Sequence, residues 1–135
     1  MITIRRQEIV KLEDVLHLYQ AVGWTNYTHQ PQMLEKALSH SLAIYLARDG
    51  DAVVGLVGDG FSSVFVQDLI VLPCYQRQGI GSDLMKEALG DYKDAYQVQL
   101  VTEQTEKTLG FYRSLGFETL STYDCIGMIW VDRKR

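Results

Sequence analysis

Residues 71–82, Val-Leu-Pro-Cys-Tyr-Gln-Arg-Gln-Gly-Ile-Gly-Ser, combine the side chains and the spacing of an anion-binding loop. The first turn of a helix leaves backbone N–H groups without intrahelical acceptors, and the helix dipole adds partial positive charge there. Gly79 and Gly81 have no Cβ atom, so a bulky anion can approach the backbone closely. Arg77 adds a charged donor for a phosphate oxygen. The segment therefore predicts a site for a pyrophosphate group.

Several kinds of phosphate-binding loop contain glycines at such a position, and their spacing distinguishes them. A P-loop requires a lysine directly after its last glycine, and neither glycine here is followed by one. A dinucleotide-binding loop requires a third glycine, where this chain has Leu84. The remaining form, Q/R-x-x-G-x-G/A, matches residues 76–81 at every specified position. A glycine-rich turn without a ligand is the alternative interpretation.

This loop and two further segments resemble the GNAT superfamily of N-acetyltransferases. The strand before the loop ends in residues 68–73 (DLIVLP), and residues 111–117 (FYRSLGF) follow in the order typical of that family. The resemblance implies the GNAT acyl-CoA N-acyltransferase fold. That fold is an α/β domain whose mixed, mostly antiparallel sheet contains a splayed parallel strand pair and is flanked by about four helices. It also implies acetyl-CoA as the cofactor and an amine as the acceptor.

The resemblance also implies which residues bind the cofactor. Backbone N–H groups of the loop would hold the pyrophosphate, and the pantetheine arm would pair along the preceding strand as an added strand does. A backbone N–H near Ile70 or Val71 would stabilise the oxyanion of the tetrahedral intermediate. The expected cofactor-binding residues are Leu69, Ile70, Val71, Gln76, Arg77, Gln78, Gly79, Ile80, Gly81, Ser82, Thr105 and Phe111.

Tyr112 lies where many GNAT enzymes place the general acid that protonates the leaving CoA thiolate. A tyrosine, with a pKa of about 10, is protonated at neutral pH and can donate that proton. Packing, or contact with CoA without proton transfer, is the alternative role. Some relatives that acetylate protein N-termini carry a catalytic glutamate where this chain has Leu100. The candidates for the general base are therefore Glu103, Asp68, Asp59 and water.

In the same family an asparagine often precedes the last helix, and Thr105 takes that position here. Thr105 can cap the helix or bond the cofactor. The two differences from the family pattern, Leu100 in place of glutamate and Thr105 in place of asparagine, argue against the subclass that acetylates protein N-termini.

The resemblance places the acceptor pocket beside the segment between the first two helices. Here that segment is residues 23–29 (GWTNYTH), whose Trp24 and Tyr27 offer an apolar wall or a ring face for a cation. Covering the core is the alternative role for both rings. The expected substrate-binding residues are Trp24, Tyr27, Asp68 and Glu103, and no residue identifies the acceptor amine.

The expected elements alternate between strands and helices. Strands are expected around residues 2–4 and over residues 42–47, 52–57, 63–71, 96–101, 117–122 and 126–131. Helices are expected over residues 12–22, 31–38, 80–89 and 107–115, with Gly23, Gly90 and Gly116 as C-terminal stops. Asp49 and Gly50 predict a tight hairpin turn. Because no repeat or linker interrupts this order, residues 1–135 are expected to form a single domain.

The composition limits the class of protein. Of the 135 residues, 47% are apolar and 22% are charged, and no apolar run is long enough to cross a membrane. The net charge of -4 argues against a nucleic-acid partner and suits a cationic substrate. Two cysteines and scattered histidines predict neither a disulfide framework nor a metal site. Since the N-terminus lacks the apolar region of a signal peptide, we expect a cytoplasmic protein without a membrane partner.

The sequence therefore predicts an acetyl-CoA-dependent N-acetyltransferase. The acceptor would be a primary amine of a small molecule or a peptide, which attacks directly to give a tetrahedral intermediate. A non-catalytic acyl-CoA-binding regulatory module is the alternative, because no obvious base accompanies Tyr112. A possible homodimer would pair through the expected closing strands, residues 117–131, since an edge strand can bind a second copy.

Overall fold

The structure is a computed structural model that describes residues 3–48 and 50–131. Its chain divides into two units, Met1–Val101 and Thr102–Arg135. The first unit contains the sheet and most of the helices. The expectation of a single domain over residues 1–135 stays a prediction.

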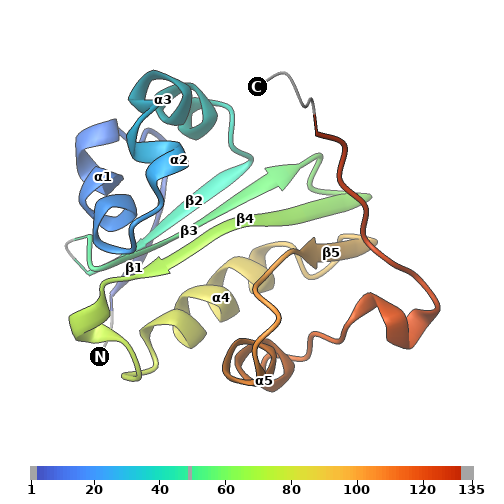
Figure 1. The fold of residues 1–135 in the computed structure, drawn as a ribbon. Coiled ribbons are helices and arrows are strands. Elements are labelled where there is room, and N and C mark those ends of the chain that lie inside the picture. Colours follow the sequence, from blue (N-terminus) through green and yellow to red (C-terminus); the bar gives the residue numbers. More distant parts are fainter. Residues whose placement is uncertain (1–2, 49, 132–135) are drawn as a thin grey trace. The chain divides into compact units, whose positions relative to one another are not determined.

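The first unit is built on a five-stranded sheet with the strand order β1-β2-β3-β4-β5. Neighbouring strands are antiparallel except for β4 and β5, which are parallel (Figure 1). The predicted mixed α/β fold, with a mostly antiparallel sheet and one parallel pair, is confirmed. The strands are β1 Ile4–Gln7, β2 Ala43–Ala47, β3 Ala52–Gly58, β4 Ser63–Val71 and β5 Gln97–Leu100.

Helices cover both faces of this sheet (Figure 1). One face carries α1 (Leu12–Ala21), α2 (Thr25–Thr28) and α3 (Pro31–Ser39), and the other carries α4 (Ile80–Asp91). The apolar positions of α1 repeat at helical spacing, and Val15 and Leu18 are fully buried. On the opposite side, Leu84 and Met85 of α4 are fully buried as well. The sheet is therefore the middle layer between two hydrophobic cores.

The hairpin between β2 and β3 forms where it was predicted. Arg48 and Gly50 both have positive φ angles, 54° and 93°, as a tight turn requires. Asp49, the other predicted turn residue, lies outside the described residues, as does Ile2 of the predicted first strand. The Arg48 guanidinium pairs with Asp51 at 2.9 Å across this turn.

The predicted end of α4 at Leu89 is wrong, because the helix continues through Gly90 to Asp91. Glycine in a helix is unfavourable by roughly 1 kcal/mol relative to alanine, which tertiary contacts can offset. Asp91 supplies such a contact: its carboxylate accepts a 2.6 Å hydrogen bond from the Tyr45 hydroxyl. The bond joins the end of α4 to β2 and stabilises the last turn.

The second unit contains α5 (Glu106–Ser114) and a short 3-10 helix, η2 (Leu120–Tyr123). Gly116, with φ of 98°, follows α5 as predicted. The predicted strand over residues 117–122 is wrong. Side-chain hydroxyls compete with a strand ladder here: Thr119 bonds Ser121 at 2.9 Å, and the Thr122 N–H turns back to the Thr119 carbonyl.

The predicted strand over residues 126–131 is also wrong, since no described residue pairs with this segment. A single extended segment without a ladder partner leaves its backbone groups to water. Its large apolar side chains are exposed: Ile126, Met128, Ile129, Trp130 and Val131. Among the described residues, no helix is both long and apolar enough to cross a membrane.

Candidate active site

The predicted anion-binding loop joins β4 to α4 and adopts an unusual backbone. After a 3-10 turn, η1 (Pro73–Tyr75), the chain enters the left-handed region at Arg77 (φ 66°) and again at Gly79 (φ 82°). Gly79 is the N-cap of α4, and a Cβ atom at this position would meet no neighbour. Its positive φ is therefore the reason for glycine there. A left-handed conformation at arginine costs energy and is typical of functional loops.

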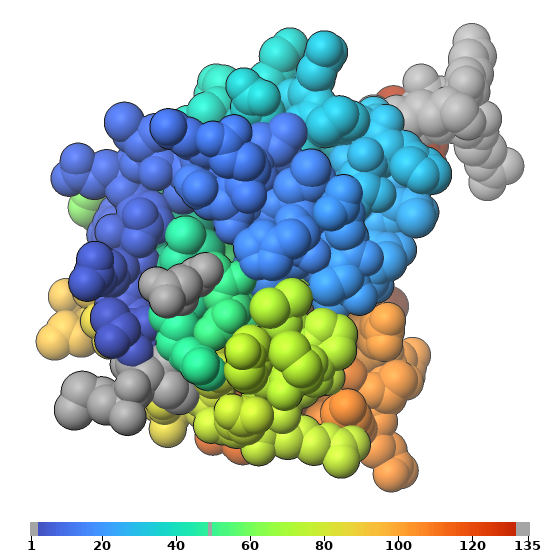
Figure 2. Space-filling view, turned by 90° about the vertical axis from the view of Figure 1, so that its left-hand side faces the viewer, coloured from blue at the N-terminus to red at the C-terminus, as the bar shows by residue number. Residues whose placement is uncertain are grey.

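This backbone leaves a row of donors free. None of the N–H groups from Arg77 to Ser82 donates to a backbone carbonyl or side chain of the described residues. The first bond within the helix is made by the Asp83 N–H to the Gly79 carbonyl, at 3.0 Å. Figure 2 shows η1 and the loop, in yellow-green, on the exposed surface beside α1 and α2. The loop can therefore accept a pyrophosphate from solvent.

Two of the expected loop residues have structural roles of their own. The Gln76 side chain donates a 3.2 Å hydrogen bond to the Val71 carbonyl, which closes the loop against the end of β4. The Ile80 side chain is 1% exposed and belongs to the core, so only its backbone N–H faces the anion site. Arg77 and Gln78 are exposed.

Beside the loop, β4 and β5 separate. The two strands pair only from Ser63 to Val66 on β4, opposite Gln97 to Leu100 on β5. On its other side, β4 stays paired with β3 as far as Val71. The remainder of β4, residues 67–71, therefore has one open edge that leads to the loop. This is the splayed parallel pair that the sequence predicted.

The hydrogen-bond alternation of β4 shows which groups face the open edge. The Leu72 N–H donates to the Asp51 carbonyl at 2.9 Å, which makes these two residues a hydrogen-bonded pair. Two residues earlier, Ile70 opposite Val53 is the next such pair. Leu69 and Val71 therefore direct their backbone groups to the open edge. Of the two N–H groups expected to stabilise an oxyanion, the geometry favours that of Val71 over that of Ile70.

A β-bulge shapes the same strand. The pairing with β3 shifts between Gly55 and Leu56, so that Gln67 is an extra residue in β4. Two consecutive side chains then reach the same tyrosine on the α1–α3 side of the sheet. Gln67 Nε2 donates to the Tyr27 hydroxyl at 3.2 Å, and that hydroxyl lies 3.5 Å from Asp68 Oδ1.

Asp68 is held more closely by a second tyrosine. The Tyr19 hydroxyl of α1 donates a 2.7 Å hydrogen bond to Asp68 Oδ2. Burial raises the pKa of the Asp68 carboxyl above its ordinary value, while the hydrogen bonds from Tyr19 and Tyr27 act in the opposite direction. Burial, reinforced by the charge of Asp68, also raises the pKa of Tyr19. The Tyr19 hydroxyl therefore keeps its proton and stays a donor at neutral pH.

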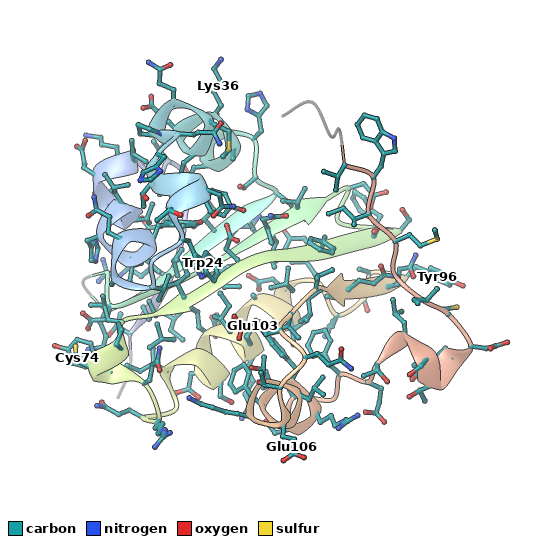
Figure 3. All side chains as sticks on the ribbon, in the orientation of Figure 1. Trp24, Lys36, Cys74, Tyr96, Glu103 and Glu106 are labelled. Carbon is teal, nitrogen blue, oxygen red and sulfur yellow. The ribbon has the colours of Figure 1, made fainter. Side chains whose placement is uncertain are left out.

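Three aromatic rings lie next to one another in this region. The Tyr19 and Tyr27 ring centroids are 5.0 Å apart, and Trp24 lies 6.0 Å from Tyr19. In Figure 3, Trp24 lies between the helical layer and the sheet. Trp24 packs against the core, whereas Tyr19, Tyr27 and Asp68 line a cavity of about 310 Å³. Of the expected acceptor residues, the structure thus brings Tyr27 and Asp68 together.

The expected catalytic residue Tyr112 lies on α5 in the second unit. Its ring packs edge-on against Phe111, at 5.0 Å, and Phe117, at 5.8 Å. Burial raises the pKa of the Tyr112 hydroxyl, and a hydrogen bond with Thr102 partly offsets the effect. The phenol is therefore protonated at neutral pH, as a general acid must be.

The other expected residues of the second unit differ in their surroundings. Thr105 caps α5: its Oγ1 accepts a 3.2 Å hydrogen bond from the Thr108 N–H. Phe111 is half-buried beside Tyr112, and Glu103 is exposed. The Glu103 backbone carbonyl accepts a 3.0 Å hydrogen bond from the Thr105 N–H.

Sequence reasoning missed Tyr19 and Gln67 as part of the site. Tyr19 fits the apolar repeat of α1, and its side chain is 2% exposed. The Tyr19 hydroxyl could have indicated a polar neighbour, because a buried tyrosine usually finds a hydrogen-bond partner. The four-residue helix α2, which positions Tyr27, was not predicted either.

A mixed sheet whose parallel pair opens beside a glycine-containing helix N-terminus defines the architecture of an acyl-CoA N-acyltransferase. The family model "Acetyltransferase (GNAT) domain" matches residues 40–119, which include β2 to β5, the loop and α5. The chain belongs to the GNAT acetyltransferase family.

Known proteins agree with this assignment. A GNAT-family acetyltransferase from Streptococcus pneumoniae TIGR4 is 76% identical, with a TM-score of 0.89 over 98% of this chain and 99% of that chain. GCN5-related N-acetyltransferase 1, chloroplastic, of Arabidopsis thaliana is 28% identical over 97% of this chain and 68% of its own length. The PaiA N-acetyltransferase from Thermoplasma acidophilum, solved with coenzyme A, shares the fold at 18% identity. Its TM-score is 0.66, over 87% of this chain and 91% of that chain.

Proposed function

We propose that this protein is an acetyl-CoA-dependent N-acetyltransferase whose acceptor is a primary amine of a small molecule or a peptide. Membership of the GNAT family supports acetyl transfer. The observation that carries the cofactor assignment is a path formed by two separate stretches of free backbone groups. The first is the open edge of β4 within residues 67–71, and the second is the row of N–H groups of residues 77–82. The coenzyme A bound to the Thermoplasma relative supports it further.

Each part of this path suits a different part of the cofactor. The N–H groups from Arg77 to Ser82 would bind the pyrophosphate, and the Arg77 guanidinium would add charge. Backbone groups of Leu69 would pair with the amides of the pantetheine arm, since the Val71 carbonyl already accepts from Gln76 Nε2. The Val71 N–H would also stabilise the oxyanion that forms when the amine attacks. Thr105 and Phe111 are proposed as further cofactor contacts.

Proton transfer is assigned to side chains of this chain. The amine nitrogen attacks the thioester carbonyl carbon, the C–S bond breaks, and Tyr112 donates its proton to the departing sulfur. The amine must lose one proton before attack, because an amine of pKa about 10 is mostly protonated at neutral pH. The nitrogen loses a second proton as the intermediate collapses, and that proton restores the Tyr112 hydroxyl through solvent. Asp68, whose pKa is raised by burial, or water next to it would accept the first proton. Exposed Glu103 is the weaker candidate for this role.

Titration calorimetry with acetyl-CoA tests the cofactor site. We expect the wild-type protein to bind acetyl-CoA and the Gly81→Glu variant to bind at least about tenfold more weakly, because its carboxylate repels the pyrophosphate. Gly90→Glu is the matched control, since it adds the same charge to the same helix at a position with no close neighbour. The control should bind like the wild type.

If the wild type does not bind acetyl-CoA, the proposed function is wrong. Binding without turnover of any amine would instead favour the non-catalytic acyl-CoA-binding module. A cytoplasmic location stays a prediction from the sequence.

A further inference from the structure

The cavity beside Asp68 has the properties of a pocket for one cationic group on an apolar body. Its volume is about 310 Å³, near the lower limit of small-molecule sites. It lies in the first unit, between α3 and the strands β2, β3 and β4. Asp68 is the one carboxylate among the described residues that line it.

The carboxylate is ready to receive a positive charge. Tyr19 and Tyr27 donate to different oxygens of Asp68, at 2.7 and 3.5 Å. A carboxylate has about four acceptor positions, so about two are left for an ammonium group. No arginine or lysine is among the lining residues, so the charge of Asp68 has no cationic side chain against it in the cavity. His40 lines the cavity as well but is exposed.

The rest of the cavity is mainly apolar. Met33, Ala37 and Leu38 of α3 form one wall, and Val57 of β3 contributes from the sheet. Met33 and Val57 are 38% and 40% exposed, respectively, which is high for large apolar side chains beside a core.

A polyamine or an aminoglycoside carries several ammonium groups, and a second ammonium group would meet these apolar walls without a partner. Burying an unpaired charge is strongly unfavourable.

We propose that this cavity is the acceptor site and that it selects an amine with one ammonium group on a compact apolar body, such as an arylalkylamine or a short alkylamine. The ammonium binds Asp68, and the apolar body lies against α3. The inference rests on the proposed function, because Asp68 directly precedes Leu69, where the open edge of β4 would hold the cofactor arm.

The first test compares amines at saturating acetyl-CoA. Phenethylamine and hexylamine represent the proposed class; spermidine, an aminoglycoside and a short peptide with a free N-terminus represent the others. We expect kcat/KM to be at least about tenfold higher for the first two. A preference for any of the other three overturns the inference.

The second test alters the cavity. Asp68→Asn keeps an oxygen that can accept from Tyr19 but removes the charge, so it should raise KM for phenethylamine about tenfold or more. Met33→Lys adds a cation to the wall and should have the same effect. Gln32→Lys is the matched control, because it adds the same charge to α3 at a residue that does not line the cavity, and its KM should not change.

Direct binding separates this inference from the proposed function. Phenethylamine is titrated into the protein saturated with CoA, and the same variants are compared. If Asp68→Asn and Met33→Lys bind both acetyl-CoA and phenethylamine as the wild type does, Asp68 only holds α1 to β4. That result overturns this inference and leaves the proposed function intact. Loss of acetyl-CoA binding in the wild type contradicts the proposed function instead.

Discussion

At the scale of single residues, two tyrosine hydroxyl groups keep their protons at neutral pH. Tyr19 is a permanent donor to Asp68 because burial and the neighbouring carboxylate both disfavour the phenolate. Tyr112 is kept protonated by its buried ring environment. The two tyrosines thus serve different ends: Tyr19 positions a carboxylate, and Tyr112 is proposed to supply a proton.

The role of Tyr112 leads to a kinetic prediction. Tyr112→Phe removes the hydroxyl and keeps the ring between Phe111 and Phe117, so the fold should be preserved. We expect kcat to fall about a hundredfold, as is typical for loss of a general acid, with little change in the Kd for acetyl-CoA. Because the pKa of Tyr112 is raised, titration of its hydroxyl should lower the wild-type kcat only at a pH above the ordinary pKa of a tyrosine.

Steady-state kinetics over a range of pH, with calorimetry of acetyl-CoA, measures both quantities. An unchanged kcat at saturating substrates would show that the Tyr112 hydroxyl only packs or contacts CoA.

The glycine-containing loop before α4 could be predicted from the sequence, whereas the residues that bond the Asp68 carboxylate could not. The glycines and Arg77 belong to one short segment, so their spacing in the sequence carries the information. Tyr19 and Asp68 are 49 positions apart and meet only because α1 packs on β4. Sequence alone therefore identified Asp68 as a candidate without showing what holds it.

At the scale of elements, β4 is the strand that joins the proposed cofactor site to the proposed acceptor site. Its bulge at Gln67 turns two consecutive side chains toward Tyr27, and its open edge begins after Val66. The strand itself was predicted with the correct bounds, residues 63–71. The bulge was not predictable, because it depends on the register with β3 and not on the local apolar pattern.

The tight turn that connects β3 and β4 gives a stability prediction. Gly58 has φ of 134°, and a Cβ atom there would lie 2.2 Å from the Ser63 carbonyl oxygen. Gly58→Ala should therefore lower the free energy of unfolding by about 2 kcal/mol or more, through strain and steric clash. Gly90→Ala, inside α4 with open space around it, should raise it by up to about 1 kcal/mol.

Urea unfolding of the two variants and the wild type measures these changes. Equal stability of Gly58→Ala and the wild type would mean that the turn relaxes at little cost.

At the scale of the whole molecule, residues 126–131 form a segment whose large apolar side chains are exposed. Trp130 is 83% exposed and Met128 is 94% exposed. Exposed apolar side chains in such number are unfavourable in water. The homodimer predicted from the sequence remains a prediction, although the closing strands on which it was based are not formed.

Trp130 provides a way to test that prediction. If the segment is buried between two copies, the fluorescence emission should shift to shorter wavelength as protein concentration rises, and sedimentation should show the dimer. Trp130→Phe should remove the spectral change while Trp24 is kept. A monomer at all concentrations, with constant emission, would contradict the homodimer.

The sequence by itself determined the order of the strands and of the longer helices in the first unit and the loop of residues 76–82. These features are local: hydrophobic periodicity sets an element, and the first turn of a helix directs its own N–H groups. Tertiary structure decided the open edge of β4, the cavity beside Asp68 and the absence of closing strands. The reason is physical, because strand pairing and cavities exist only where segments distant in the chain meet, and a segment's own residues do not specify its partner.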